Sequence, residues 1–378
     1  MLKFGVIGYG NRIGGIVDKL IKSGEATLTA VMDPELERVK AKAMEKGYEG
    51  ITFYTDAEEM LEKEQLDGVL IGTRCNLHTH YAMLVAKHNI PLFLEKPVCT
   101  TEEDLARLES IVPTMNTKTV VSFPLRTSAI LLKVKELIDS GKIGTVEHVQ
   151  AYNNVPYGRG YYHKWYRLES ETGGQWLQKA THDLDYINLL LGGLRPIRLC
   201  AVKSHRVFGG EEPAGKLCVD CDKQRTCPES PYNVKKIGDG YVIGPYCCYA
   251  KDVSIEDSGS CIVEYESGMH VVYTQNFVAR NGAGKRGARL IGFKGTLEFD
   301  WVTSTIRVFR HQENITEEYT VHRTGTSHFG GDQNLVDNFI DIMKGVASSD
   351  APLSDGIFSA HLCLCAKKSS LEHIFVDI

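Results

Sequence analysis

Residues 4–14 read Phe4-Gly5-Val6-Ile7-Gly8-Tyr9-Gly10-Asn11-Arg12-Ile13-Gly14. The apolar half predicts a β-strand that ends in a glycine-rich turn, and residues 11–22 predict the helix that follows. A dinucleotide-binding turn uses its first glycine for a tight turn, its second for close approach of the pyrophosphate, and its third for close helix packing. Ile13 stands in the third place and Gly14 comes one residue late, so the turn departs from the usual pattern there.

The surroundings of this turn still favour a nucleotide. A strand precedes it, and the amides at the start of the following helix attract anions. Asp33 ends the second predicted strand, where a carboxylate accepts ribose hydroxyls and repels a 2′-phosphate, which favours NAD over NADP. The alternative is a structural turn with a surface aspartate. The predicted cofactor contacts from this region are Gly8, Gly10, Asn11, Arg12, Ile13 and Asp33.

The pattern of elements changes partway along the chain. Up to about residue 124, strands and helices alternate as in a doubly wound parallel sheet. Beyond it, residues 125–139 and 174–191 predict helices, and residues 145–152 and 197–309 supply mostly strands before two closing helices, 332–345 and 355–375. We therefore predict an α/β domain over 1–124, which binds NAD, and an α+β domain over 125–378 with a large, open, mostly antiparallel sheet, for substrate binding and oligomerisation.

Composition narrows the class of protein. The chain has 378 residues, of which 43% are hydrophobic, and a net charge of −5, which predicts a globular protein of two or three domains. Because there is no broad positive charge, nucleic acid is not an expected partner. No apolar run approaches the roughly 18 residues of a membrane helix, and no secretory pattern is evident. We expect a cytoplasmic protein that acts on a small molecule and makes no membrane contact.

The motif Glu95-Lys96-Pro97 follows the apolar run of residues 90–94. This places Lys96 at the carboxyl end of a parallel strand, where ligands gather. Hydride transfer from an alcohol needs a positive group to stabilise the developing alkoxide and a group to take the hydroxyl proton. Lys96 meets the first need, and a surface lysine at a strand end is the alternative.

A second constellation lies on the predicted helix 174–191. Lys179 and His182 are three residues apart, so on an α-helix they share a face and can address one substrate. A satisfied core histidine is the alternative. Before this helix, Tyr157, Trp165 and Arg167 form an aromatic and basic stretch suited to a sugar ring, although simple packing explains it equally well.

A cysteine cluster falls in residues 209–252, a region poor in apolar periodicity. It contains Cys218-Val219-Asp220-Cys221, Cys227 and Cys247-Cys248. Two thiolates at this spacing can hold one metal ion, and two more complete a tetrahedral set, which predicts a structural zinc ion. Free thiols and a redox pair are the alternatives.

These motifs together resemble the glucose-fructose oxidoreductase and inositol dehydrogenase family, written Gfo/Idh/MocA. The resemblance rests on the glycine turn, residues 72–80, Glu95-Lys96-Pro97 and Thr181-His182-Asp183. It implies a Rossmann domain and an open-sheet domain with nicotinamide between them, substrates among sugars and cyclitols, and pairing into a homo-dimer or homo-tetramer through the second sheet.

The resemblance also implies roles for single residues. In the family the histidine at position 182 is the usual proton acceptor, and many members carry aspartate where this chain has Gln178, so the chain resembles a branch with lysine at position 179. That branch carries a similar cysteine-rich insertion, whose last ligand corresponds better to Cys247 than to Cys248. The implied nicotinamide-side contacts are Thr73, Asn76, His78, Glu95 and Lys96, and His328 is an implied substrate contact.

The sequence thus predicts an NAD-dependent oxidoreductase that acts on a carbinol carbon of a sugar, glycoside or cyclitol. His182 takes the hydroxyl proton while Lys96 and Lys179 polarise the oxygen. One alternative is a lyase or glycosidase that oxidises its substrate transiently and retains NAD. Another is a sugar-sensing regulator that binds nucleotide without turnover.

Overall fold

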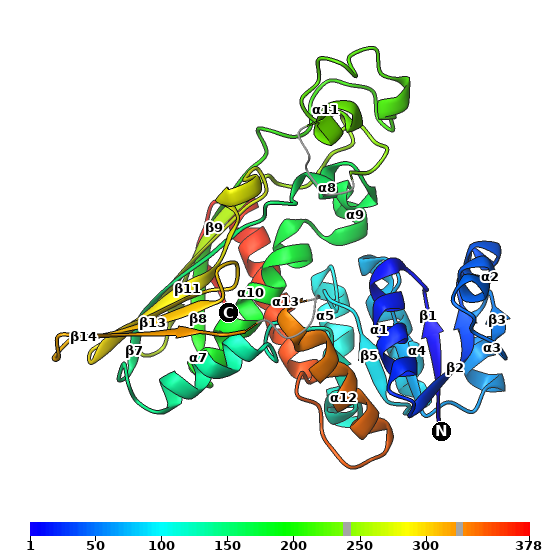
Figure 1. Ribbon diagram of the computed structural model, residues 1–378, viewed down its shortest axis with the longest axis horizontal. Helices are drawn as coiled ribbons and strands as arrows, with labels where there is room; N and C mark the ends of the chain where they lie inside the picture. The colour runs from blue at the N-terminus through cyan, green and yellow to red at the C-terminus, as the bar shows by residue number, and fades with distance from the viewer. Residues whose placement is uncertain (237–242, 323–327) are drawn as a thin grey trace. The chain divides into compact units, whose positions relative to one another are not determined.

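The computed structural model describes residues 1–236, 243–322 and 328–378 (Figure 1). They form two compact units: residues 1–131 with 323–361, and residues 132–322 with 362–378. The division falls inside two helices, α7 (Ala129–Asp139) and α13 (Leu353–Glu372). The two-domain organisation at 124/125 stays a prediction; in these compact units, residues 328–361 group with the first sheet.

The first unit contains a six-stranded parallel sheet in the order β3-β2-β1-β4-β5-β6. This is the strand order of dinucleotide-binding folds, and it confirms the predicted doubly wound sheet. The central strands are apolar and buried because helices cover both faces. The strands are β1 (Leu2–Ile7), β2 (Ala26–Met32), β3 (Thr52–Tyr54), β4 (Gly68–Ile71), β5 (Leu92–Leu94) and β6 (Thr119–Val121).

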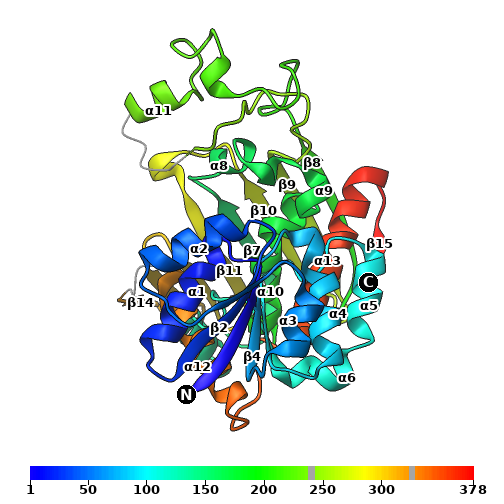
Figure 2. The same ribbon diagram turned by 90° about the vertical axis from the view of Figure 1, so that its right-hand side faces the viewer.

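Helices lie on both sides of this sheet (Figure 2). The crossover helices α1 and α2 lie on one side, and α3, α4 and α5 lie on the other, as parallel strands require. Their bounds are α1 (Asn11–Lys22), α2 (Leu36–Glu45), α3 (Ala57–Lys63), α4 (His78–Lys87), α5 (Glu102–Glu109), α6 (Val112–Met115) and α12 (Gly331–Met343).

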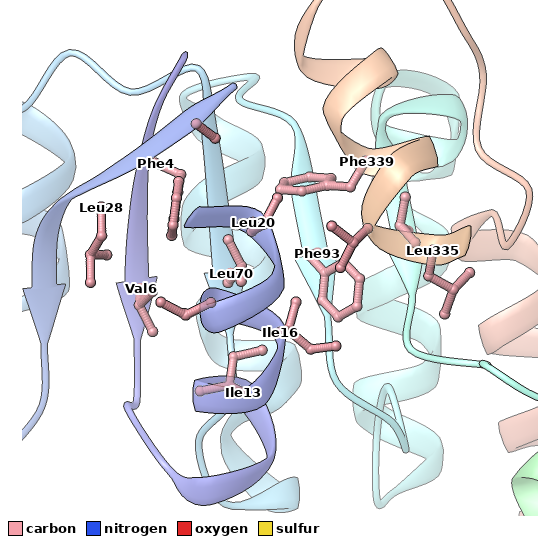
Figure 3. Close-up of a cluster of buried hydrophobic side chains, with 14 of the residues drawn as sticks. Phe4, Val6, Ile13, Ile16, Leu20, Leu28, Leu70, Phe93, Leu335 and Phe339 are labelled. Carbon is pink, nitrogen blue, oxygen red and sulfur yellow. The ribbon is translucent and has the colours of Figure 1, made fainter. Parts of the chain in front are cut away.

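The core of this unit joins segments from both ends of the sequence (Figure 3). Leu335 and Phe339 of α12 pack with Ile16 of α1 and with Phe93 of β5, and all four are essentially inaccessible to solvent. Burying each such side chain contributes about 1.5–3 kcal/mol. This contact explains why α12 belongs to the compact unit of the first sheet.

The second unit contains a nine-stranded sheet in the order β14-β13-β12-β11-β7-β10-β9-β8-β15. Strands β7 and β10 pair in parallel and the other pairs are antiparallel, which confirms the predicted open, mostly antiparallel sheet. The strands are β7 (Val146–Asn154), β8 (Pro196–Ser204), β9 (Ser258–Tyr265), β10 (His270–Asn276), β11 (Lys285–Gly292), β12 (Gly295–Asp300), β13 (Thr305–Arg310), β14 (Ile315–Thr320) and β15 (Val376–Asp377).

Helix α10 (Thr181–Leu191) packs on one face of this sheet (Figure 1). Its Tyr186 ring lies against Phe299 and Trp301. Besides parts of α7 and α13, this unit contains the short helices α8 (Arg159–Tyr162), α9 (Glu169–Thr172) and α11 (Pro231–Lys236). Among the helices of the described ranges, none has the length and apolar character needed to cross a bilayer.

Candidate active site

The glycine turn after β1 is shaped to receive a phosphate group. Gly8 has φ of +81°, and a Cβ there would lie 2.8 Å from the Thr73 backbone, so glycine is required for both conformation and space. A Cβ at Gly10 would meet nothing closer than the Gly72 carbonyl oxygen at 3.6 Å. Since Gly10 directly precedes α1, its missing side chain leaves room before the helix amides, where a pyrophosphate binds.

Ile13, the residue in the third glycine position, is part of the core. It is 1% exposed, and a Cβ added to Gly72 would lie 2.5 Å from the Ile13 Cβ. The close approach of helix α1 to the sheet is therefore made possible by Gly72, at the end of β4, rather than by a glycine in the helix. This explains how the turn tolerates isoleucine, whose side chain packs inward.

Asp33 follows β2 and is held by its neighbours. Its carboxylate accepts hydrogen bonds from the Tyr9 amide at 2.8 Å and the Glu35 amide at 2.9 Å. Arg38 Nη2 lies 3.1 and 3.0 Å from its two oxygens, and Arg38 Nη1 also donates to the Tyr9 carbonyl. The carboxylate predicted to meet the ribose is thus fixed beside the turn and paired with a cation that sequence reasoning did not identify.

The Glu95-Lys96-Pro97 motif follows β5 at the carboxyl edge of the sheet, as predicted. The Lys96–Pro97 peptide bond is cis. Glu95 is 5% exposed and forms an ion pair with Arg12, whose Nε lies 3.0 Å from Glu95 Oε1, while the Glu95 amide donates to the Ile71 carbonyl. Lys96 is partly buried. Its backbone follows directly on Glu95, which is buried and held by these contacts.

Arg12 connects three segments of the first unit. Besides Glu95, its guanidinium donates to Ser122 Oγ at 3.0 Å and to Asp332 Oδ1 at 2.6 Å. Asp332 in turn lies 2.9 Å from His328 Nδ1. Burial raises the pKa of the Asp332 carboxyl, but hydrogen bonds from His328 and Arg12 hold it far below its usual range. Arg12, a predicted cofactor contact, therefore makes structural contacts with its side chain.

His78 also joins two loops of this region. Its Nδ1 lies 2.7 Å from the Pro97 carbonyl oxygen and its Nε2 lies 3.3 Å from that of Thr73. Burial lowers the pKa of His78, so a neutral ring donates through Nδ1, the closer contact. His78 was predicted as a nicotinamide-side contact, but its ring supports the Lys96 loop. Asn76 is exposed and Thr73 half-buried at the same edge.

In the second unit, Lys179 and His182 lie on one continuous helical segment. Trp176–Ala180 forms a π-helical turn that leads into α10 at Thr181. Lys179 and His182 are each 5% exposed. Because π-helical turns are rare and frequent at functional sites, this local distortion marks the segment that carries both predicted catalytic residues.

Two buried carboxylates hold this segment in place. Glu256 accepts from the Trp176 amide at 2.9 Å, at the start of the π-helical turn. Asp183 accepts from Asn153 at 2.8 Å, Tyr273 at 2.9 Å and Arg286 Nε at 2.8 Å. Burial raises the pKa of Glu256. These contacts were not evident in the sequence, because Glu256 lies 80 residues from Trp176 and the partners of Asp183 come from three distant strands.

Lys179 is close to one of the predicted substrate residues. Its Nζ donates a hydrogen bond to Tyr157 Oη and lies 4.8 Å from the Tyr157 ring centroid. Trp165 stacks on Tyr166 with 3.9 Å between ring centroids. Arg167 is buried, forms an ion pair with Asp252 and lies 3.9 Å from the Tyr246 ring centroid. The structure thus brings Tyr157 to Lys179, whereas the Arg167 guanidinium anchors the insertion.

The cysteine cluster does not form the predicted metal centre. Across residues 1–236, 243–322 and 328–378, no three His, Cys, Asp or Glu side chains are arranged to hold a metal ion. The predicted ligands Cys218, Cys221, Cys227 and Cys247 are free cysteines, as is Cys248. Burial and the neighbouring cysteines raise the pKa of Cys218 to about 11, which favours its protonated thiol, and its Sγ donates to the Tyr246 carbonyl. The zinc prediction is therefore not supported.

The structure brings the predicted cofactor residues together at one edge of the first sheet. The glycine turn after β1, Asp33 after β2, Thr73 and Asn76 after β4, and Lys96 after β5 all lie at carboxyl ends of parallel strands. The space at Gly10, the helix that follows it and the carboxylate of Asp33 suit the pyrophosphate and ribose of a dinucleotide. His328 connects to this edge through Asp332 and Arg12.

Comparison with known proteins agrees with this architecture. The family model described as "Oxidoreductase family, NAD-binding Rossmann fold" matches residues 2–123, and the one described as "GFO/IDH/MocA C-terminal domain" matches residues 131–298. The protein YteT of Bacillus subtilis (strain 168) is 27% identical over 325 residues, which cover 76% of this chain and 75% of the relative.

Two further comparisons concern dehydrogenases. The myo-inositol 2-dehydrogenase of Thermotoga maritima is 27% identical over 194 residues, which span 50% of this chain and 55% of that enzyme. The structure of a levoglucosan dehydrogenase in complex with NADH and levoglucosan has a TM-score of 0.76 and 17% identity, and the match covers 100% of this chain and 99% of that chain. With matches to both of its domain models, the chain belongs to the Gfo/Idh/MocA family of oxidoreductases.

Proposed function

We propose that this protein is an NAD-dependent oxidoreductase that transfers hydride between the nicotinamide and a carbinol carbon of a sugar, glycoside or cyclitol. The observation that carries the proposal is the position of Lys96, which follows β5 at the same sheet edge as the glycine turn and is fixed through Glu95 and Arg12. The substrate class is supported by relatives named as inositol and levoglucosan dehydrogenases.

The nucleotide would be held by the first unit. Gly8 and Gly10 open the turn for the pyrophosphate, the first amides of α1 donate to it, and Asp33 accepts from the adenosine ribose. Thr73 and Asn76 would contact the nicotinamide half. When bound, the nicotinamide supplies a hydride acceptor at its C4 position.

The chain's own residues would handle the proton and the charge on oxygen. We assign His182 as the group that takes the hydroxyl proton, and Lys96 and Lys179 as the cations that stabilise the alkoxide. Tyr157, Trp165 and His328 are the proposed substrate contacts. Arg167 is left out of this set because its guanidinium is buried against Asp252.

A dehydrogenase assay with a panel of sugars and inositols tests the proposal. Lys96→Met should lower kcat by about 10²–10⁴-fold, because the alkoxide loses its cation, while the Kd for NADH stays unchanged. Lys87→Met, at a lysine of the same unit whose side chain is 67% exposed, should match the wild type in both measurements. Full turnover by Lys96→Met would refute the assigned site.

The same assay distinguishes the other enzymatic and non-enzymatic functions. Stoichiometric NADH formation supports net oxidation. Cleavage or elimination of the sugar with no net NADH would instead show transient oxidation with a retained cofactor. Binding of NADH with no turnover of any sugar would show a nucleotide-dependent regulator.

We also propose that the chain pairs with a second copy through the open face of the nine-stranded sheet. Val202 on β8 and Ile262 on β9 point to this same face, and they are 63% and 45% exposed. Sedimentation equilibrium measures the assembly, and a monomer at micromolar concentration would contradict the proposal.

A further inference from the structure

Tyr157 occupies a loop that the fold holds tightly. It lies between β7 and α8, and the Val155 amide donates to the Asn276 carbonyl at the end of β10. At Gly158 an added Cβ would lie 2.5 Å from the Phe277 carbonyl oxygen, so the loop can approach β10 only because this residue is glycine. The backbone that presents Tyr157 is therefore fixed against the sheet.

The side chain of Tyr157 lies in a cluster of charged and phenolic groups. Lys179 Nζ donates a hydrogen bond to the Tyr157 hydroxyl oxygen, and the Tyr161 side chain of α8 forms another hydrogen bond with Tyr157. The charges of Arg286 on β11 and Asp183 on α10 also act on the phenol. Arg286 is itself paired with Asp183 at 2.8 Å. Within the described part of the chain, no carboxylate forms an ion pair with Lys179, so the ammonium charge acts mainly on the phenol.

These surroundings change how readily the phenol ionises. Burial raises the pKa of Tyr157, but the positive charges of Lys179 and Arg286, with the hydrogen bond from Lys179, outweigh burial and bring it below the ordinary value of 10.0. Tyr161, four residues on, shows the opposite result, because burial and the neighbouring phenols raise its pKa well above the ordinary value. The pKa of a buried tyrosine that is paired with a lysine is thus shifted in the opposite direction from that of a tyrosine that is only buried.

We propose that Tyr157 is a further catalytic residue, which exchanges a proton with the substrate hydroxyl as a second acid–base group in addition to His182. This inference rests on the proposed function. When the phenolate acts, the substrate O–H bond breaks, a new O–H bond forms at Tyr157 Oη, and the electron pair stays on the substrate oxygen. Lys179 remains an ammonium ion throughout and stabilises first the phenolate and then the alkoxide.

The two acceptors serve different pH ranges. While the phenol is protonated, His182 accepts the proton. Once the phenol has lost its own proton, Tyr157 accepts the proton of the substrate hydroxyl. An enzyme without the imidazole should therefore regain turnover as the pH rises through the ionisation of Tyr157.

A spectroscopic titration tests the ionisation without any substrate. Tyrosinate absorbance is followed with pH in the wild type, Tyr157→Phe, Tyr161→Phe and Lys179→Met. We expect Tyr157→Phe to remove the tyrosinate transition at the lowest pH and Tyr161→Phe to leave it. Lys179→Met should shift it to higher pH. An unchanged lowest transition in Tyr157→Phe would overturn the proposal.

Turnover in a His182→Asn background tests the catalytic role. The residual kcat should rise at least about tenfold across the transition seen in the spectra, and His182→Asn/Tyr157→Phe should lose this rise. Identical pH profiles for the two variants would overturn the role of Tyr157, while an active wild type would leave the proposed oxidoreductase standing. A wild type without turnover on any sugar would refute the proposed function itself, and the titration would then still report the state of Tyr157.

Discussion

Arg12 Nη2 lies 2.6 Å from Asp332 Oδ1, across 320 residues of sequence. The same guanidinium forms an ion pair with Glu95, which precedes the proposed catalytic lysine, and Asp332 forms a hydrogen bond with His328. One side chain thus links the start of α1, the loop after β5 and the start of α12. The bond is part of the framework that positions Lys96, so its loss should affect stability before it affects chemistry.

Replacing Arg12 by methionine should destabilise the protein by about 3 kcal/mol, measured as the free energy of unfolding in urea. Glu95 and Asp332 are 5% and 1% exposed, and the change removes the arginine from both of these buried carboxylates. Removing one partner of a buried ion pair is costly because the remaining charge stays desolvated.

Arg107→Met is the matched control, because Arg107 also pairs with an aspartate, Asp104 at 2.9 Å, but on the surface. Exposed pairs contribute less than about 1 kcal/mol. Equal losses for Arg12→Met and Arg107→Met would show that the internal network adds nothing.

The stability contributed by Asp332 should depend on pH. Its folded-state pKa lies far below the ordinary 3.8 because of His328 and Arg12. A carboxyl group of this kind contributes its full stabilisation above its unfolded pKa and loses it as the pH falls toward the folded value. The difference in unfolding free energy between wild type and Asp332→Asn should therefore shrink as the pH falls below about 4. Urea titrations at each pH measure it, and a difference that grows as the pH falls from about 4 to about 2 would contradict the assignment.

Cofactor preference should depend on the pairing of Asp33 with Arg38. Asp33→Ser removes the carboxylate that repels a 2′-phosphate and leaves Arg38 Nη2, which lies 3.0 Å from Asp33, to bind one. We expect the ratio of NADPH to NADH affinity to rise about 100-fold, equivalent to roughly 3 kcal/mol for a charge-assisted contact. Fluorescence titration with each reduced cofactor measures the two Kd values without a substrate.

Asp33→Ser/Arg38→Met identifies the source of that change. If Arg38 binds the 2′-phosphate, the double variant should lose most of the gained NADPH affinity. If it keeps the gain, loss of repulsion alone explains the effect and Arg38 has no part in it.

The sequence predicted the fold well where local patterns determine it. Helix Asn11–Lys22 has the predicted bounds, and a strand precedes the glycine turn as predicted, within the expected alternation of strands and helices. Strand β14 was missed because its residues are mostly polar and exposed, so it lacks the apolar alternation of a half-buried strand. Strand β15 has two residues and no detectable pattern.

The candidate site was less accessible to sequence reasoning, because its partners are distant in the chain. Lys96 and Lys179 lie within motifs that can be recognised in the sequence. The Asp332–Arg12 and Arg286–Asp183 contacts form only in the folded chain. The cysteine spacing suggested a metal centre that the described residues do not form. Sequence spacing therefore does not by itself establish a metal site.

The last prediction concerns the contact between Ile13 of α1 and Gly72, the residue that follows β4. A Cβ at Gly72 would lie 2.5 Å from the Ile13 Cβ, so Gly72→Ala should cost about 1–3 kcal/mol through overpacking. Ile13→Gly should cost more, because it opens a cavity and adds a helical glycine.

Together, Ile13→Gly/Gly72→Ala moves the glycine to the helix position that dinucleotide-binding turns ordinarily use. The new methyl group then enters the space that isoleucine vacates, so the double variant should be more stable than the sum of the single losses predicts, by about 1–3 kcal/mol. Unfolding in urea measures all four proteins of the cycle. Strict additivity of the free-energy losses would mean that positions 13 and 72 do not interact. The contact with Gly72 would then not explain why the turn has isoleucine at position 13.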